Sequence, residues 1–245
     1  MIKSLFFITS LLLFTLINGC TQDSPLSDLD LTDPGLVKPD IEISRSFYSS
    51  GTTSFSHTVW IYDKNNNSVN IQDGKVSINN VELSLEKEPL NSAPYYSVDP
   101  SYQLPFKFNE NYTCNITLSD GKIYSSTVKS RSADIDSFTV PLTHNRSENL
   151  LLKWGPVDPK EKIILTMVYN FRHDSSSGTG VRDIQITNPQ TGEALVPKSF
   201  FDASSGITDA TFTLESNIYG ITDNRFKNGS EIIFIINISK KTVFK

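Results

Sequence analysis

Short runs that alternate between apolar and polar side chains are the feature that most limits what this chain can fold into. In Tyr112-Thr-Cys-Asn-Ile-Thr-Leu118 the apolar residues Tyr112, Cys114, Ile116 and Leu118 occupy every second position. A strand points successive side chains to opposite faces, so this pattern predicts a strand with one buried face. No window longer than ten residues shows a clear helical period. The sequence therefore predicts an all-β protein.

Turn-forming residues separate the predicted strands. Asp73-Gly74 and Asp120-Gly121 accept the positive φ angles of tight hairpins. Four prolines between 89 and 105 indicate a long crossover, because proline cannot donate a hydrogen bond to a central ladder. In the first half we expect strands at Ile41–Tyr48, Phe55–Tyr62, Lys75–Asn79, Val81–Glu86, Leu104–Phe108, Tyr112–Leu118 and Lys122–Val128. In the second half we expect them at Ser137–Val140, Asn149–Trp154, Ile163–Phe171, Val181–Thr187, Thr211–Leu214 and Glu231–Ser239.

These strands group into two units. About seven short strands a unit, with long connections, are typical of immunoglobulin-like sandwiches. The stretch Asn149-Leu-Leu-Leu-Lys-Trp-Gly-Pro156 resembles the second strand of fibronectin type III domains, which leads into a core tryptophan and a proline. We therefore expect two tandem immunoglobulin-like β-sandwich domains, residues 41–131 and 132–245.

The amino terminus indicates where the protein resides. The apolar run from Leu5 to Ile17 follows Lys3 and is too short to cross a bilayer core of ~30 Å. It has the features of a secretory signal, and Leu16-Ile17-Asn18-Gly19-Cys20 resembles the lipobox of bacterial lipoproteins. That resemblance implies that residues 1–19 are removed and that Cys20 is acylated, for example with palmitate. Because Thr21, and not an aspartate, follows the cysteine, the resemblance also implies sorting to the outer membrane of the cell envelope. It does not distinguish the periplasmic face of that membrane from the cell surface.

An acidic segment follows Cys20. Residues 21–40 hold five aspartates against one lysine, and they account for most of the net charge of −5. They also hold Pro25, Pro34 and Pro39 and no aromatic residue, a composition that favours disorder. We expect residues 20–40 to form a flexible tether.

The rest of the chain, from residue 41 onward, is nearly neutral, and this limits the classes of function that it can have. It has no basic block, which argues against nucleic acid as a partner. With Cys20 acylated, Cys114 has no disulfide partner, and its place on a buried face predicts a small core side chain. The three histidines are far apart in sequence, and His57 in Ser54-Phe-Ser-His-Thr-Val-Trp60 is expected to point to solvent. No catalytic residue is predicted.

Metal and cofactor motifs are also weak. Asp63-Lys-Asn-Asn-Asn67 has the spacing that begins an EF-hand loop, but the sixth position is Ser68 and the twelfth is Gly74. A polar hairpin tip is the preferred interpretation, because asparagine tolerates left-handed backbone. No Cys/His cluster suits zinc. We predict no metal site and no cofactor.

A proline-stiffened loop holds the predicted ligand-binding residues Tyr95, Tyr96 and Tyr102. Rigid aromatic side chains can stack on sugars or anchor a protein partner. The alternative, which we favour, is that these rings plug the open end of the sandwich.

The function expected from these features is non-catalytic. We expect a lipid-anchored cell-envelope protein that binds or assembles a partner through its sandwich loops. The alternative is a carbohydrate-binding accessory lipoprotein of a glycan-uptake system, and a sandwich-fold hydrolase is a third interpretation. The expected partners are therefore the membrane, through the lipid anchor, and a protein or glycan ligand.

Overall fold

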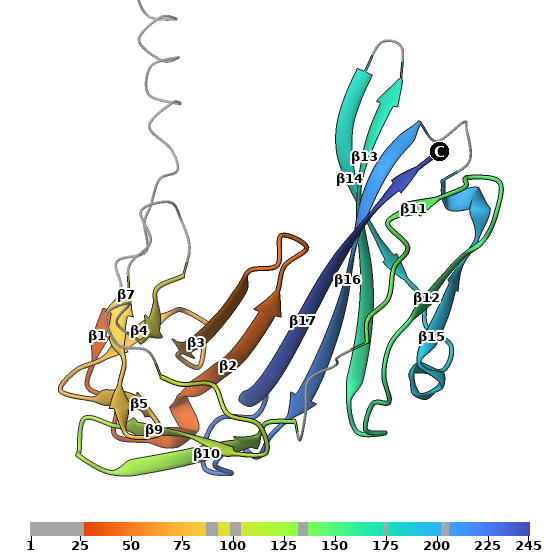
Figure 1. The fold of residues 1–245 in the computed structure, drawn as a ribbon. Helices are drawn as coiled ribbons and strands as arrows, with labels where there is room; N and C mark the ends of the chain where they lie inside the picture. Colours follow the sequence, from red (N-terminus) through yellow and green to blue (C-terminus); the bar gives the residue numbers. More distant parts are fainter. Residues whose placement is uncertain (1–26, 87–92, 99–103, 132–136, 174–175, 202–205) are drawn as a thin grey trace, which may run out of the picture.

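The computed structural model describes residues 27–86, 93–98, 104–131, 137–173, 176–201 and 206–245. As expected, the described chain is all-β, with three 3-10 turns and several sheets (Figure 1). The largest sheet has nine strands in the order β14-β13-β16-β17-β2-β3-β8-β7, with β11 joined to β17. Its strands are β2 (Lys38–Phe47), β3 (Thr53–Tyr62), β7 (Ser84–Glu86), β8 (Tyr95–Ser97), β11 (Thr143–His144), β13 (Lys162–His173), β14 (Ser176–Ile184), β16 (Ile207–Tyr219) and β17 (Glu231–Phe244).

Three smaller sheets accompany it. A four-stranded sheet has the order β10-β9-β5-β6, and two-stranded sheets join β1 to β4 and β12 to β15. Their strands are β1 (Ser27–Leu29), β4 (Val69–Ile71), β5 (Lys75–Ile78), β6 (Val81–Glu82), β9 (Asn111–Thr117), β10 (Ile123–Lys129), β12 (Leu150–Lys153) and β15 (Glu193–Val196). The 3-10 turns are η1 (Pro34–Leu36), η2 (Pro189–Thr191) and η3 (Lys198–Phe200).

Strand β17 is the centre of the large sheet. It pairs antiparallel with β16 along most of its length, and its first eight residues pair in parallel with β2, from Glu231↔Asp40 to Ile238↔Phe47. Alternate residues of β17, from Ile232 to Ile238, are buried. The apolar run in this strand therefore fills a core on one face of the sheet.

Two separate layers cover that face. Phe234 stacks on Tyr112 of β9, with ring centroids 6.1 Å apart, whereas Phe244 stacks on Phe201, just after η3, at 4.7 Å. Both phenylalanines occupy even positions of β17, so they point to the same side of the sheet. Figure 1 shows the β5-β9-β10 layer at the end nearer β2 and the β12–β15 layer beside β13.

This arrangement differs from two separate tandem sandwiches. The covering layers do fall on either side of the expected boundary at residues 131 and 132, but one sheet continues beneath both. The parallel pair of β2 and β17 makes that connection. Its strands lie about 190 residues apart in sequence, so local periodicity cannot reveal that they are neighbours.

The segment expected as a tether is also shorter than residues 20–40. From Ser27 onward the chain forms β1, η1 and the start of β2. Leu31 and Val37 are buried, and the backbone N–H of Leu31 donates to the Ser119 hydroxyl at 3.0 Å. Two apolar side chains and this hydrogen bond hold the acidic segment against the body. The signal peptide and Cys20 lie outside the described residues.

Most predicted strands are confirmed within a few residues of their expected ends, with exceptions that matter for the site. Leu104–Phe108 and Ser137–Val140 are not strands, while β1, β4, β8, β11 and β15 were not expected. Cys114 is completely buried, as predicted, and burial raises the pKa of its thiol to about 12. Trp154 is buried and its indole N–H donates to the Pro189 carbonyl at 3.1 Å.

Candidate binding pocket

A pocket of about 840 Å³ opens beside β3, at the place where β8 stops accompanying that strand. Its volume lies within the range of ordinary ligand sites. The described lining residues come from four segments: Arg45 of β2, Thr53–Thr58 of β3, Tyr95 with Ser97 and Val98 from β8 and its end, and Leu104–Phe106 of the opposite wall.

One side of the pocket is formed by the part of β3 that lies beyond its short pairing with β8. On its inner side β3 pairs with β2 along ten residues, from Phe47↔Thr53 to Lys38↔Tyr62. On its outer side β8 pairs only with Thr58 and Val59. Among the described residues, no strand pairs with Thr53–His57 on that outer side.

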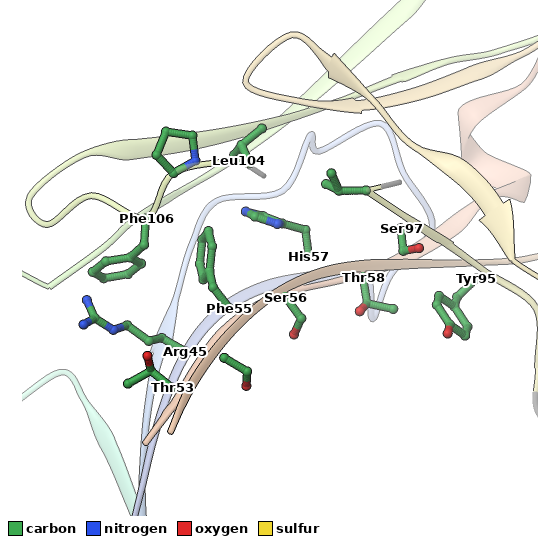
Figure 2. Close-up of a pocket in the computed structure, with 13 residues that line it drawn as sticks. Arg45, Thr53, Phe55, Ser56, His57, Thr58, Tyr95, Ser97, Leu104 and Phe106 are labelled. Atoms are coloured by element: carbon green, nitrogen blue, oxygen red, sulfur yellow. The ribbon is translucent and has the colours of Figure 1, made fainter. Parts of the chain in front are cut away.

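Side chains of β3 alternate between two faces at this edge. Figure 2 shows Phe55 and His57 on the side where Leu104 and Phe106 lie, and Ser56 on the opposite side. This alternation follows from the period of a strand. The edge therefore presents an aromatic face toward the wall and a hydroxyl-bearing face away from it.

His57 differs from its expected position. It is 5% exposed, and its ring lies edge-on to Phe55 with centroids 4.2 Å apart. Burial lowers its pKa to about 4, so the imidazole is neutral at physiological pH. In the described structure its Nε2 atom has no hydrogen-bond partner. The expectation of a solvent-facing side chain was wrong. His57 lies two positions from both Phe55 and Val59, so its side chain points to the same, core-facing side of the strand.

Arg45 supplies the positive charge in the pocket. Its guanidinium carbon lies 4.5, 4.3 and 5.2 Å from the ring centroids of Phe47, Phe106 and Phe108. Such contacts favour a cation over aromatic faces. Arg45 is also the cross-strand neighbour of Phe55. Among the described lining residues, Arg45 is the one with a formal charge at neutral pH.

The opposite wall is held in place by hydrogen bonds and ring contacts. The backbone N–H of Lys107 donates to the Tyr112 hydroxyl at 2.9 Å, and the Ser130 hydroxyl donates to the Lys107 carbonyl at 2.9 Å. Phe106 also stacks on Phe234, with centroids 5.9 Å apart. The wall is thus a preformed part of the structure, although it is not the strand expected at Leu104–Phe108.

The tyrosines predicted to bind a ligand do not form one platform. Tyr96 is buried, and its hydroxyl donates to Asn70 Oδ1 at 2.6 Å, which fits the packing interpretation. Tyr95 is half-buried, lies 6.2 Å from the Trp60 ring centroid and lines the pocket. Tyr102 lies outside the described residues. Only Tyr95 therefore joins the pocket as a described member of the predicted set.

The Asp63 turn fits the preferred polar-tip interpretation. Asp63 Oδ1 accepts hydrogen bonds from the backbone N–H groups of Asn65 and Asn67, at 2.7 and 2.9 Å, and Asn66 has a φ of 63°. No group of three His, Cys, Asp or Glu residues suited to a metal ion occurs in the parts of the chain that the structure describes.

Neither protein-family models nor curated proteins give a match to this chain. None of the helices formed by the described residues has the length and apolar character needed to cross a bilayer. The site is therefore interpreted from its own geometry. One signal could have indicated it from the sequence: His57 lies two positions from Phe55, so the two side chains share one face of the strand.

Proposed function

We propose that this protein is a lipid-anchored, non-catalytic binding protein of the bacterial cell envelope, and that its partner occupies the pocket beside β3. The sequence supports the anchor through the lipobox resemblance at Cys20. The observation that carries the binding role is the buried, unpartnered Nε2 of His57 in the wall of a preformed pocket.

An unsatisfied buried polar atom is costly for a fold. Leaving such an atom without a partner costs on the order of 1–3 kcal/mol, and unsatisfied atoms are uncommon enough to require an explanation. A ligand that hydrogen-bonds His57 would remove this cost, provided that neighbouring side chains move to expose Nε2, which is buried in the described structure. The aromatic contacts of Phe55 and Phe106 would supply apolar contact area.

A glycan ligand is the second candidate, favoured by the hydroxyl groups of Thr53, Ser54, Ser56, Thr58 and Ser97 in the lining. Two of these hydroxyls already have partners. Ser56 Oγ lies 2.7 Å from Ser44 Oγ, and Ser54 Oγ lies 3.2 Å from the Tyr48 hydroxyl. This reduces the hydrogen-bonding capacity left for a sugar, so we place a protein partner first.

The anchor is tested with Cys20→Ser. Labelled palmitate should mark the wild-type protein, and the variant should lose the label and leave the membrane fraction. Full retention of the variant in membranes would contradict lipid anchoring.

The pocket is tested by site-specific crosslinking in cells of the source bacterium. A photoreactive amino acid at Thr53, an exposed residue of the pocket, should form an adduct with an envelope component. The same group at Thr179, exposed on the open edge strand β14, is the matched control. The proposal fails if Thr53 gives no adduct, or if His57→Phe leaves the adduct unchanged.

A further inference from the structure

We propose that the face of the large sheet opposite its covering layers is a second interaction surface, and that it docks a basic segment of a protein partner. We call this surface the acidic face; it lies on β16, β17 and β2, and its members are Asp40, Glu42, Glu215, Glu231, Ile233 and Ile235. None of these six residues belongs to the described lining of the pocket beside β3. The inference therefore goes beyond the proposed function and does not depend on that pocket.

The acidic face is accessible to solvent. The two covering layers pack on even positions of β17, so the odd positions point to the opposite face. The odd residues from Glu231 to Ser239 are partly exposed, and so are Asp40, Glu42 and Glu215. A partner can therefore contact these side chains without any movement of the sheet.

The carboxylates of the acidic face lack compensating charges. Glu231 and Asp40 are register partners across the β17–β2 pair, and Glu42 follows Asp40 by two positions on the same face. Within the described structure, none of the four carboxylates belongs to an ion pair. Like charges directly opposite each other destabilise a sheet. A cationic partner would remove this cost, so the charges are complementary to a basic segment.

Shifted pKa values agree with this repulsion. Burial and then the Glu231 charge raise the pKa of Asp40, and the charge of Lys38 offsets only part of the shift. Burial also raises the pKa of Glu42, and the charges of Asp40 and Glu215 raise it further. These effects connect all four acids in one negative surface.

A buried amide adds to this negative surface. Asn217 is 6% exposed, and its Nδ2 donates to Glu215 Oε1 at 2.7 Å. Its Oδ1 atom has no hydrogen-bond partner in the described structure. The partial negative charge of this oxygen therefore adds to the potential of the acidic face. A cation on the face is stabilised by that potential without having to reach Oδ1.

Apolar and aromatic side chains lie in the same rows as the acids. Tyr219, Ile233 and Glu42 are successive register partners across three strands, and Tyr219 is 49% exposed. Trp60 of β3 is the register partner of Asp40. Aromatic faces attract cations, and long basic side chains cover apolar surface with their methylene groups. Because alternate residues of β2 are about 7 Å apart, the acids suit several lysine or arginine side chains rather than one ion.

The first experiment selects ligands without assuming their sequence. Random eight-residue peptides displayed on phage are selected on the full chain, purified in mild detergent. Recovered peptides should be enriched in lysine and arginine relative to the unselected library. Recovery of no peptide, or of peptides without this enrichment, would overturn the proposal.

Variants of the protein then test the acids. The double variant Asp40→Asn/Glu42→Gln should weaken a selected synthetic peptide about tenfold. The matched control is Glu148→Gln/Glu193→Gln, which neutralises two exposed acids outside the acidic face and should change affinity about twofold or less. Equal weakening by both variants would show attraction to net charge alone and would overturn the site.

Stability measurements separate lost binding from lost folding. Neutralising Asp40 should stabilise the free protein, because it removes the repulsion by Glu231, and should at the same time weaken the peptide. Urea unfolding and affinity should therefore change in opposite directions. A double variant that is both less stable and weaker in binding would overturn the proposal, because the acids would then serve the fold.

Crosslinking locates the bound peptide. A carbodiimide joins a lysine to a carboxylate in contact with it, and the adducts should map to acids of the acidic face. Adducts spread over acids elsewhere would overturn the site. Spermine is the probe for a small polyamine, and binding of spermine without recovery of any basic peptide would overturn the protein partner. The Thr53 crosslink reports the pocket alone, so the proposed function and this inference can fail separately.

Discussion

At the scale of single residues, His57 is the most informative side chain. Its imidazole lies close to Phe55 and Tyr112, with centroids 4.2 and 6.1 Å away, and is almost completely enclosed. Phenylalanine or leucine would fill this position without a desolvation cost. The proposed binding role would account for a histidine at this position, because the ring could then hydrogen-bond the ligand.

The same burial predicts a pH dependence of stability. The pKa of His57 falls from 6.5 to about 4 on folding, so the unfolded chain binds a proton first as pH falls. Stability from the neutral imidazole is therefore full above pH 6.5 and is lost as pH falls toward 4, by about 2–3 kcal/mol between pH 7 and pH 4.5. Urea unfolding at both pH values should show this loss in wild type. Between the same two pH values, the His57→Phe variant should lose about 2–3 kcal/mol less stability than wild type. Equal losses in the two proteins would contradict a buried, neutral His57.

Cys114 provides a second test at this scale. It is completely buried, and its pKa is raised to about 12, so the native thiol should be inert. A thiol reagent such as dithionitrobenzoate should label the chain only after unfolding in urea. Rapid labelling of the native protein, in the Cys20→Ser background, would show that the β9 layer opens readily.

At the scale of elements, the parallel pair of β2 and β17 places two acids opposite each other. Asp40 and Glu231 are register partners, and the pKa of Asp40 is raised by burial and then by the Glu231 charge. Folding therefore disfavours the ionised form of Asp40. This cost in stability is full above the raised pKa of the folded state, and it disappears as the pH falls to the ordinary carboxyl pKa of 3.8.

We expect Asp40→Asn to stabilise the protein by about 0.5–1 kcal/mol at pH 7, with no gain at pH 3. Thermal unfolding at the two pH values measures this. Glu193→Gln is the control, because Glu193 faces Lys153 across β12 and β15 and should not stabilise the protein when neutralised. A destabilised Asp40→Asn at pH 7 would contradict the expectation.

A buried ion pair joins the segment after β10 to the loop before β13. Arg131 follows β10, and its Nε lies 3.2 Å from Glu161 Oε1, with both side chains less than a tenth exposed. The Ser216 hydroxyl of β16 donates to Glu161 Oε2 at 2.7 Å, and Arg131 Nη2 donates to the Pro156 carbonyl at 3.2 Å. Removing one partner leaves a buried charge without compensation.

Arg131→Met and Glu161→Gln should therefore each cost about 3–5 kcal/mol. The double variant should cost clearly less than the sum, because neither charge is then left alone. Urea unfolding of the four proteins gives the coupling free energy. Additive effects would show that the pair does not act as a unit.

At the scale of the whole molecule, the shared sheet predicts one cooperative unit rather than two independent domains. Each half contains one tryptophan, Trp60 in β3 and Trp154 after β12. In Trp154→Phe and Trp60→Phe, fluorescence should report each half separately. In each variant the fluorescence and circular-dichroism midpoints in urea should coincide.

Two resolved transitions would instead favour the tandem arrangement expected from the sequence. The physical reason to expect one transition is the β2–β17 ladder. Separating the halves would expose the paired edge of β17 and the apolar side chains of Ile41 and Ile43, which are fully buried. Stability of either half alone would then have to come from a single covering layer.

The sequence by itself determined the local elements. Two-residue alternation predicted most strands and the burial of Cys114, and the Asp-Gly pairs predicted the turns at Asp73 and Asp120. These features depend on neighbours within a few positions. Segment composition alone wrongly suggested that residues 27–40 are a tether, since two apolar side chains were enough to dock them.

Only the tertiary structure decided which strands are partners and where β8 pairs with β3. The pairing of β2 with β17 and the end of β8 beside Thr58 depend on packing between segments far apart in the chain. The same packing brings Arg45, His57 and Phe106 together around one pocket. Periodicity shows which side of a strand is apolar, but the free energy that selects its neighbour comes from long-range contacts, which no local pattern records.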